Sequence, residues 1–244
     1  MSSLPHINPK QETDKIISFL GKTFKKQKID KVVLGLSGGI DSTTALYLLR
    51  EVLPAKNIFA VQMNYYHQKK SEIDLKGINV INVSIKKIVD QFRVEGSKEK
   101  IRLGNIMTRV RMIILFDLAK QINGLVCGTE NKSERLLGYF TRFGDSASDI
   151  EPISHLYKTQ VYQLAKYLKV PKVIINQSPT AGLWDGQTDE NDFGFTYEEA
   201  DQVLYLVDGR LQDINGIKKK FPNAEKIINR FKDNKFKLKT PYSL

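Results

Sequence analysis

The feature that most limits the fold is an alternation of short apolar runs with longer amphipathic segments through the first half of the chain. The apolar runs are rich in branched residues and predict buried strands at residues 31–36, 57–63, 79–83 and 124–127. Segments with helical periodicity lie around them, at residues 13–27, 43–52, 69–76, 85–92 and 97–122. Strands separated by helices form right-handed βαβ units. The predicted class is therefore α/β, a doubly wound, mostly parallel sheet with helices on both faces.

The second half of the chain changes character. Helical patterns predict further helices at residues 131–140, 158–168, 196–207 and 216–231. Two segments lack apolar periodicity and are expected to be loops, at residues 141–157 and 178–192. Long loops in a compact domain are usually lids or binding loops. We expect residues 1–244 to form a single domain, the simplest arrangement at this length.

Composition narrows the class of protein. No apolar run approaches the roughly 18 residues of a membrane span, and the N-terminus lacks the apolar stretch of a signal peptide. The only cysteine, Cys127, lies in an apolar run and is expected to be a buried small hydrophobe. We therefore expect a soluble, cytoplasmic protein. The formal charge of +11 favours anionic partners such as nucleotides or RNA, although it is equally compatible with a generally lysine-rich surface.

The loop after the first predicted strand carries the clearest chemical signal. Residues 36–42 read Leu-Ser-Gly-Gly-Ile-Asp-Ser and lead into a helix that Asp41 or Ser42 is placed to cap. Two glycines allow close approach of a ligand, and loop amides at a helix N-terminus suit a phosphate. Because Asp41 repels a bare phosphate, a divalent cation such as Mg²⁺ is expected between them. The plain alternative is a glycine turn with Asp41 as the helix cap.

A second segment begins where the fourth predicted strand ends. It contains Thr129, which can hydrogen-bond a nucleotide, and Glu134, which can complete a metal site begun by Asp41. Further along, Lys158 can neutralise phosphates as a point charge. Each residue taken alone has a structural alternative, since Glu134 also stabilises a helix start and Lys158 also suits a solvated first turn.

Two more segments break the apolar pattern. Residues 179–190 read Pro-Thr-Ala-Gly-Leu-Trp-Asp-Gly-Gln-Thr-Asp-Glu and are expected to be a loop. Asn105, Arg109 and Arg111 interrupt an otherwise apolar helix. Such residues suit dinucleotide phosphates, a dimer partner or a solvated helix face.

The Ser37–Ser42 motif resembles the pyrophosphate-binding loop of the ATP-pyrophosphatase superfamily, whose enzymes cleave ATP between the α and β phosphates. Together with GTENKSE, GYFTRFGD, LYKTQV, PTAGLWDGQTDE and GNIMTRVRM it is similar to the NAD synthetase family over residues 13 to 240. The resemblance implies an adenine nucleotide α-hydrolase-like, Rossmann-like fold. It implies an acid–ammonia ligase that converts deamido-NAD to NAD through an adenylate, using ATP, Mg²⁺ and ammonia. It also implies a homodimer that binds the dinucleotide near the subunit interface.

The resemblance assigns roles to individual residues. Those expected to contact ATP are Gly35, Leu36, Ser37, Gly38, Gly39, Ile40, Asp41, Ser42, Thr129, Lys158 and Thr180. Asp41 and Glu134 are expected to bind Mg²⁺. Those expected to contact deamido-NAD are Asn105, Arg109, Arg142, Asp149 and Lys237. In the tail, Phe236 stands where many members have a histidine beside the lysine.

Asp145 is our candidate for holding ammonia or ammonium near the adenylate, a hypothesis based on its acidity and its place in the loop after the metal residue. Two other functions stay open. A tRNA-modifying enzyme of the same superfamily suits the positive charge, and a nucleotide sensor without turnover suits the loop alone. A built-in glutamine amidotransferase is not expected, because it needs an extra domain with a nucleophilic cysteine.

Overall fold

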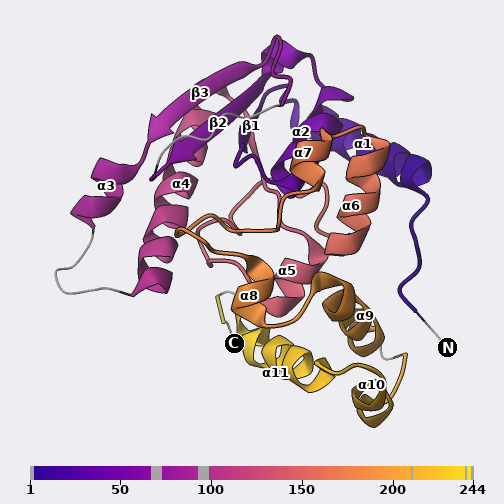
Figure 1. The fold of residues 1–244 in the computed structure, drawn as a ribbon. Helices are drawn as coiled ribbons and strands as arrows, with labels where there is room; N and C mark the ends of the chain where they lie inside the picture. Colours follow the sequence, from indigo (N-terminus) through magenta and orange to yellow (C-terminus); the bar gives the residue numbers. More distant parts are fainter. Residues whose placement is uncertain (1–2, 67–72, 93–98, 210, 240, 243–244) are drawn as a thin grey trace.

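A parallel sheet of four strands forms the centre of the computed structural model, which describes residues 3–66, 73–92, 99–209, 211–239 and 241–242 (Figure 1). The strands are β1 (Val32–Gly35), β2 (Ile58–Asn64), β3 (Asn79–Ser84) and β4 (Leu125–Cys127), in the spatial order β3-β2-β1-β4. Val32 of β1 pairs with Ile58 on one side and with Leu125 on the other. The order changes direction between β1 and β4, and ligands of doubly wound sheets bind at such a switch point.

Helices cover both faces of this sheet, as the sequence predicts (Figure 1). One face carries α1 (Pro9–Gln27), α2 (Ile40–Arg50), α6 (Lys158–Tyr167) and the short α7 (Lys172–Ile175), whose apolar side chains share a core with β1. The other face carries α3 (Lys86–Gln91) and the long α4 (Lys100–Ile122), which pack on β1, β2 and β4 around a separate core. The branched residues of β1, β2 and β4 are largely buried between these layers, which explains their continuous apolar pattern. Strand β3 lies at the edge of the sheet with Val80 exposed, so the prediction of a buried strand there is wrong.

The C-terminal helices pack together beyond the carboxyl ends of the strands (Figure 1). They are α5 (Lys132–Leu137), α8 (Asp189–Phe193), α9 (Tyr197–Asp208), α10 (Ile214–Lys220) and α11 (Ala224–Asn234). Their core includes Phe193, Tyr197 and Ile228. Two short 3-10 helices, Ala55–Asn57 and Lys235–Leu238, complete the elements of the described chain. Within this group, α5 packs against α9 and α11 and also contacts α6, which links the group to the helices on the sheet.

Several sequence predictions need correction. Helix α2 begins at Ile40 with Gly39 in the capping position and no side-chain cap, so the prediction that Asp41 or Ser42 caps it is wrong. Both residues lie instead in the first turn of the helix. The helix predicted at residues 69–76 falls partly outside the described residues, and residues 73–76 are not helical.

The predicted helix at residues 216–231 is two helices. Helix α10 ends at Lys220 and α11 begins at Ala224, with Pro222 between them. Proline has no backbone N–H and disfavours helical conformation in the residue before it, which explains the break. The short helices α7 and α8 were not predicted, because four or five residues are too few to show a helical period.

Two expectations from composition have counterparts in the structure. Cys127 is free and buried at the end of β4, as expected. In the described part of the chain, no helix combines the length and apolar character needed to cross a membrane.

The close approach of α5 and α11 depends on Gly138. This glycine ends α5 with a φ of 64°, and a Cβ atom there would lie 2.3 Å from the Cβ of Asn234. We predict that Gly138→Ala lowers the free energy of unfolding by about 2–4 kcal/mol, from left-handed backbone strain plus overpacking. Urea unfolding measures the loss.

Gly182→Ala is the matched control. Gly182 has a similar φ of 63°, but no atom lies within 4 Å of its Cβ position. Backbone strain alone costs about 1 kcal/mol. Equal losses in the two variants would show that the contact with Asn234 does not limit the fold.

Candidate active site

The glycine-containing loop lies at the carboxyl end of β1, beside β4. Gly38 adopts a φ of 83°, which glycine tolerates best, and no atom lies within 4 Å of its Cβ position. The Ser37 hydroxyl accepts a hydrogen bond from the Gly39 amide at 3.2 Å and lies 3.0 Å from the Ser42 hydroxyl. These bonds fix the turn that leads into α2. The predicted nucleotide loop is therefore a strand-to-helix turn at the switch point of the sheet.

Asn131 joins this loop to the segment after β4. Its buried side chain accepts a hydrogen bond from the Glu134 amide at 3.0 Å, which caps α5. Its amide group donates to Asp41 Oδ1, also at 3.0 Å. Asn131 was not among the predicted site residues, although an asparagine three residues before Glu134, at the start of a predicted helix, is a helix-capping signal.

The residues predicted to bind metal and phosphate converge on one buried ammonium group. Lys158, at the start of α6, is 2% exposed, and its Nζ lies 2.5 Å from Asp41 Oδ2 and 3.1 Å from Glu134 Oε1. Burial alone lowers the pKa of an ammonium group, but the neighbouring carboxylates of Asp41 and Glu134 offset this and raise the pKa of Lys158 above its usual range. Three elements far apart in the sequence thus meet at one point.

Burial also raises the pKa of Glu134, and the charges of Asp41 and Asp189 add to this, while the Lys158 ammonium opposes it. The Lys158 ammonium is thus the cation that offsets the crowded negative charge of this cluster.

The geometry of Asp41 and Glu134 suits a hard cation. Their oxygens approach a common point from different elements, as the shared contact with Lys158 shows. Among the residues that the structure describes, no group of three or more His, Cys, Asp and Glu side chains is arranged to hold a metal ion. Mg²⁺ is commonly bound by one or two carboxylates with phosphate and water oxygens completing its shell. The donors therefore fit Mg²⁺ together with a phosphate ligand.

Asp201, on α9, holds α5 and α6 together next to this cluster and was not predicted. It is fully buried; the Ser133 hydroxyl donates to its Oδ1, and the amide and hydroxyl of Thr159 donate to its Oδ2, both at 2.8 Å. The Ser133 hydroxyl also accepts from the Lys158 amide at 2.8 Å. Burial raises the pKa of Asp201 to about 6, against the hydrogen bonds from Ser133 and Thr159. An acid within the apolar face of a helix is the sequence signal that would have found it.

Asp189, in the last of the predicted loops, lies near the same cluster. It is 2% exposed, and its Oδ2 accepts a hydrogen bond from the Tyr197 hydroxyl at 3.0 Å. Its other oxygen, Oδ1, is buried without a hydrogen-bond partner among the described residues. Burial raises the pKa of Asp189, and the charge of Lys158 opposes this. A buried carboxylate oxygen without a partner is costly.

The residues predicted to contact the dinucleotide hold the loop at residues 138–149. Asn105 accepts a hydrogen bond from the Thr141 hydroxyl at 2.7 Å, and Arg109 reaches the carbonyl of Arg142 at 3.4 Å. Asp149 accepts from the amide of Val126, in β4, at 2.7 Å. Asn105, Arg109 and Asp149 therefore meet around one loop.

The C-terminal tail reaches the same loop. Lys237 donates to the carbonyls of Gly138 at 2.6 Å and Phe140 at 3.0 Å. The guanidinium of Arg142 lies 5.1 Å from the ring centre of Phe236, at cation–π distance. The residue that departs from the expected histidine thus contacts one of the predicted substrate residues.

The remaining predicted residues are placed as follows. Asp145 is exposed and accepts a hydrogen bond from the Thr141 amide at 2.7 Å. Thr129 is half-buried after β4. Thr180 is exposed, and its hydroxyl accepts from the Gly182 amide at 3.1 Å. The contact of Thr180 with phosphate beside Lys158 stays a prediction.

A second carboxylate pair was not predicted. Glu151 accepts hydrogen bonds from the Glu130 amide at 3.2 Å and the Ser148 hydroxyl at 2.7 Å. A Cβ atom at Gly128 would lie only 1.8 Å from Glu151 Oε1, so the glycine leaves room for this carboxylate. Burial and the charge of Glu151 raise the pKa of Glu130 to about 8, and burial raises the pKa of Glu151 to about 7.

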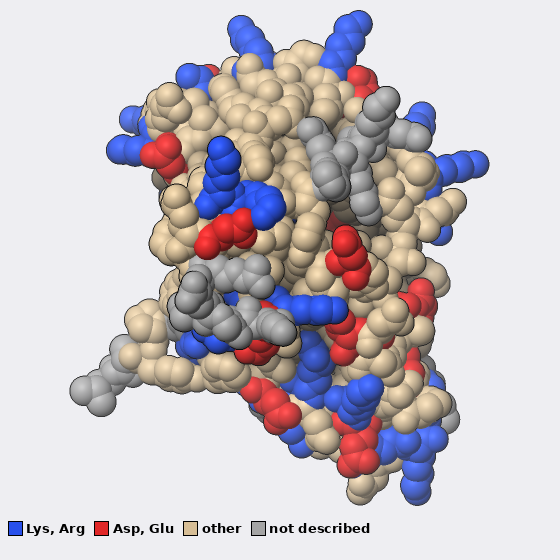
Figure 2. Space-filling view, turned by 60° about the vertical axis from the view of Figure 1, so that its left-hand side comes forward, with Lys and Arg blue, Asp and Glu red and all other residues tan. Residues whose placement is uncertain are grey.

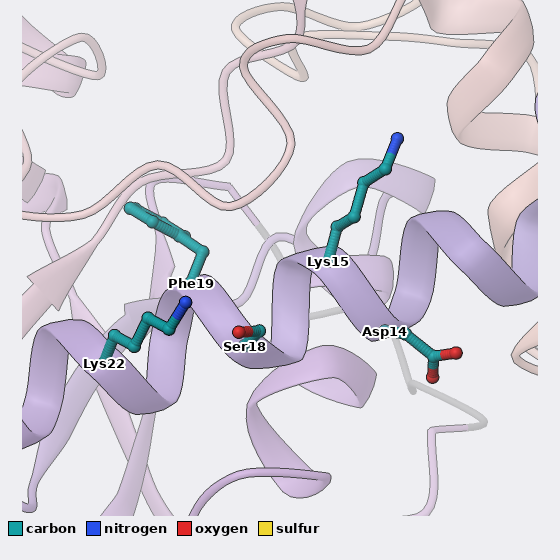
Figure 3. Close-up of a pocket in the computed structure, with 5 residues that line it drawn as sticks. All are labelled: Asp14, Lys15, Ser18, Phe19 and Lys22. Carbon is teal, nitrogen blue, oxygen red and sulfur yellow. The ribbon is translucent and has the colours of Figure 1, made fainter.

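A surface hollow of about 610 Å³ lies elsewhere, over the outer side of α1. The side chains that line it all come from this helix: Asp14, Lys15, Ser18, Phe19 and Lys22 (Figure 3). Figure 3 shows the charged ends of Asp14 and Lys15 pointing in different directions rather than into a shared space. This hollow is separate from the charged cluster and lacks convergent polar groups.

Known proteins are similar to this chain in sequence and fold. The model of the family described as NAD synthase matches residues 12–241. An NH(3)-dependent NAD(+) synthetase from Fusobacterium nucleatum subsp. nucleatum is 46% identical over 208 residues, which cover 82% of this chain and 80% of that protein.

Two solved structures agree closely. An NH3-dependent NAD synthetase from Campylobacter jejuni, in complex with the nitrate ion, is 32% identical with a TM-score of 0.82, over 98% of this chain and 100% of that one. An NMN synthetase from Francisella tularensis is 33% identical with a TM-score of 0.84, over 98% and 99% of the two chains.

The Glu130–Glu151 pair makes stability depend on pH. Because the pKa of Glu130 rises from 4.5 to about 8 on folding, the folded protein holds the proton more tightly than the unfolded chain. The free energy of unfolding therefore falls as pH rises through this window. We predict that Glu130→Gln removes part of this loss. The free energy of unfolding of the variant, relative to that of the wild type, should be about 1–3 kcal/mol higher at pH 9 than at pH 5.

Thermal or urea unfolding of the wild type and the variant between pH 5 and pH 9 measures the difference. Glu198→Gln, at an exposed position of α9, is the control and should follow the wild type. Parallel curves for Glu130→Gln and the wild type would contradict a raised pKa at Glu130.

Proposed function

This chain belongs to the NAD synthase family, and on that basis we propose that it catalyses ammonia-dependent amidation of deamido-NAD to NAD, using ATP and Mg²⁺. The observation that carries the proposal is the convergence of Asp41, Glu134 and Lys158 at the carboxyl ends of β1 and β4. Cleavage of ATP requires a metal ion at its phosphates, and a pair of carboxylates beside a phosphate-binding loop is suited to hold that ion. The class of enzyme is an acid–ammonia ligase.

In the proposed reaction, the nicotinate carboxylate attacks the α-phosphorus of ATP. The bond to the bridging oxygen breaks, and pyrophosphate leaves with its electron pair. Ammonia then attacks the acyl carbon of the adenylate; a proton is lost, the amide forms, and AMP leaves. The chain contributes positioning and charge neutralisation, which account for most of the rate in phosphoryl transfer.

The site residues divide between the two nucleotides. We propose that the amides of residues 35–42 with Thr129 and Thr180 bind ATP, and that Lys158 neutralises its phosphates. Asp41 and Glu134 would hold Mg²⁺, which supplies positive charge at the phosphate oxygens. Around the loop at residues 138–149, the substrate contacts proposed for deamido-NAD come from Asn105, Arg109, Arg142, Asp149 and Lys237.

The alternatives have weaker support. Figure 2 shows Lys and Arg side chains spread among acidic ones over the face that carries α3 and α4, not gathered into one basic patch. A tRNA-modifying enzyme would be expected to concentrate them. A sensor without turnover has no need for the carboxylate pair on Lys158.

One relative supports a second candidate substrate. The NMN synthetase from Francisella tularensis matches nearly the whole chain with a TM-score of 0.84. Amidation of the deamido mononucleotide would use the same carboxylate chemistry, with a shorter substrate. The ratio of kcat/KM for the mononucleotide and the dinucleotide acids decides between the two.

We also propose a single domain, a homodimer and a cytoplasmic location. The family match spans residues 12–241, which supports one domain. Helix α4 supports the dimer, because it exposes Ile101 and Ile113, with exposed fractions of 62% and 56%. Arg109 is also exposed, one turn before Ile113. Exposed apolar side chains on a helix often mark a subunit interface.

Pyrophosphate release is the direct test of the function. The complete mixture contains ATP, Mg²⁺, deamido-NAD and ammonium, and each component is omitted in turn. Release that requires deamido-NAD, with NAD formed only when ammonium is present, supports the proposal. Pyrophosphate release with tRNA or another carboxylate, and none with deamido-NAD, would contradict the proposed substrate. It would still support the proposed cleavage of ATP.

The proposed role of Asp145 in binding ammonium can be tested by substitution. We predict that Asp145→Asn raises the ammonium concentration needed for half-maximal rate at least about tenfold, because a carboxylate that binds ammonium is lost. The KM for ATP should change little. Steady-state kinetics against ammonium measures this, and Asp185→Asn, at an exposed loop position, is the control. An unchanged ammonium dependence would remove Asp145 from the mechanism.

The dimer proposal rests on α4. We predict that Ile113→Glu shifts the protein toward monomer, because burying an unpaired charge at an interface costs several kcal/mol. Sedimentation velocity measures the mass. Val173→Glu changes an exposed apolar residue on α7 and should leave the mass unchanged. A wild type that sediments as a monomer at micromolar concentration would contradict the proposal.

A further inference from the structure

Lys158 and a metal ion would compete for the same carboxylate oxygens of Asp41 and Glu134. The ammonium group of Lys158 contacts Asp41 Oδ2 at 2.5 Å and Glu134 Oε1 at 3.1 Å, and it is almost completely buried. These are the two carboxylates that the proposed function assigns to Mg²⁺. The structure therefore places a positive side chain where the family's metal ion is expected.

Two cations cannot occupy this point together. Mg²⁺ binds oxygen at about 2.0–2.1 Å and requires near-octahedral geometry. An ammonium hydrogen-bonded to the same two oxygens would lie within a few ångströms of the metal, where repulsion in a poorly hydrated site is strong. Binding of the metal to Asp41 and Glu134 thus requires Lys158 to move. Its four-carbon side chain allows such movement without a change in the backbone.

Asp189 offers a second position for the ammonium group. Its Oδ1 is buried and without a hydrogen-bond partner among the described residues. Its Oδ2 is held by the Tyr197 hydroxyl at 3.0 Å, and Lys158 Nζ lies 5.3 Å from the centre of the Tyr197 ring. Lys158 and Asp189 therefore flank the same buried ring.

We propose that Lys158 is a tethered cation that a divalent metal displaces from Asp41 and Glu134, and that Asp189 receives the displaced ammonium group. The proposal rests on the proposed function only in taking Mg²⁺ as the metal. It has a consequence for binding order: the metal alone binds weakly, because it competes with an ion pair already formed. A nucleotide phosphate strengthens binding by offering Lys158 a further partner.

Mn²⁺ titration without nucleotide tests the competition. Free Mn²⁺ is followed by its electron paramagnetic resonance signal, with the full-length protein. Lys158→Met removes the tethered cation, and we expect the variant to bind Mn²⁺ at least about tenfold more tightly than the wild type. Lys166→Met, at an exposed position of the same helix, is the control and should bind like the wild type. Equal or weaker binding by Lys158→Met would overturn the proposal.

Asp189 is tested in both backgrounds. If it receives the displaced ammonium, Asp189→Asn weakens Mn²⁺ binding in the wild type by at least about threefold, but has no effect when Lys158→Met is already present. If Asp189 instead binds the metal itself, Asp189→Asn weakens binding equally in both backgrounds, and the role proposed for it is wrong. Asp185→Asn, at an exposed loop position four residues before Asp189, is the control.

Folding is checked for every variant by circular dichroism. If Lys158→Met does not fold, Lys158→Gln, which retains a hydrogen-bond donor for the two carboxylates, replaces it with the same expected result. The titration contains neither deamido-NAD nor ammonia. If the wild type is active but the Lys158 and Asp189 variants bind Mn²⁺ as the wild type does, only this inference is contradicted. If Lys158→Met binds Mn²⁺ more tightly but the wild type does not convert deamido-NAD, only the proposed function is contradicted.

Discussion

A buried ammonium group is stable only where carboxylates surround it, and the structure meets this condition at Lys158 by bringing three distant segments together. Asp41 lies in the turn after β1, Glu134 lies in α5 after β4, and Lys158 begins α6. Removing either carboxylate would leave a buried charge poorly compensated, at a cost of several kcal/mol. The positions of α2, α5 and α6 over the ends of the strands are therefore tied to this one ion-pair cluster.

The remaining structure holds the cluster in place. Parallel pairing of β1 with β4 brings their carboxyl ends side by side, so the loops that follow them meet. Asn131 binds Asp41 directly, and Asp201 joins α5 to α6 through Ser133 and Thr159. The side chains of Asn131 and Asp201 are buried and hydrogen-bonded, and such polar contacts specify one arrangement more sharply than apolar packing does. The C-terminal helices thus contribute to the site through Asp189 and Asp201, although most of their residues are far from it.

Local patterns in the sequence predicted the layers of the fold, because strand and helix periods are local signals. The Ser37–Ser42 loop pointed to Asp41, whereas Glu134 and Lys158 were assigned through the resemblance of the longer segments around them to a known family. The capping of α2 and the short helices α7 and α8 were missed, since they involve fewer residues than a helical period needs. The break between α10 and α11 was missed because the apolar pattern continues across Pro222, although the proline itself is a local signal for it. Asp189, Asp201 and the Glu130–Glu151 pair were missed for another reason. Their importance arises from burial and from partners distant in the sequence, which no local pattern records.

The proposed reaction joins the α-phosphorus of ATP to a carboxylate oxygen of the substrate. The most direct test uses deamido-NAD labelled with ¹⁸O in its carboxylate, turned over with ATP, Mg²⁺ and ammonium. An adenylate intermediate predicts that each AMP formed carries one ¹⁸O in its phosphate, with the other label retained in the amide. AMP without label, or label recovered in pyrophosphate or inorganic phosphate, would contradict the account.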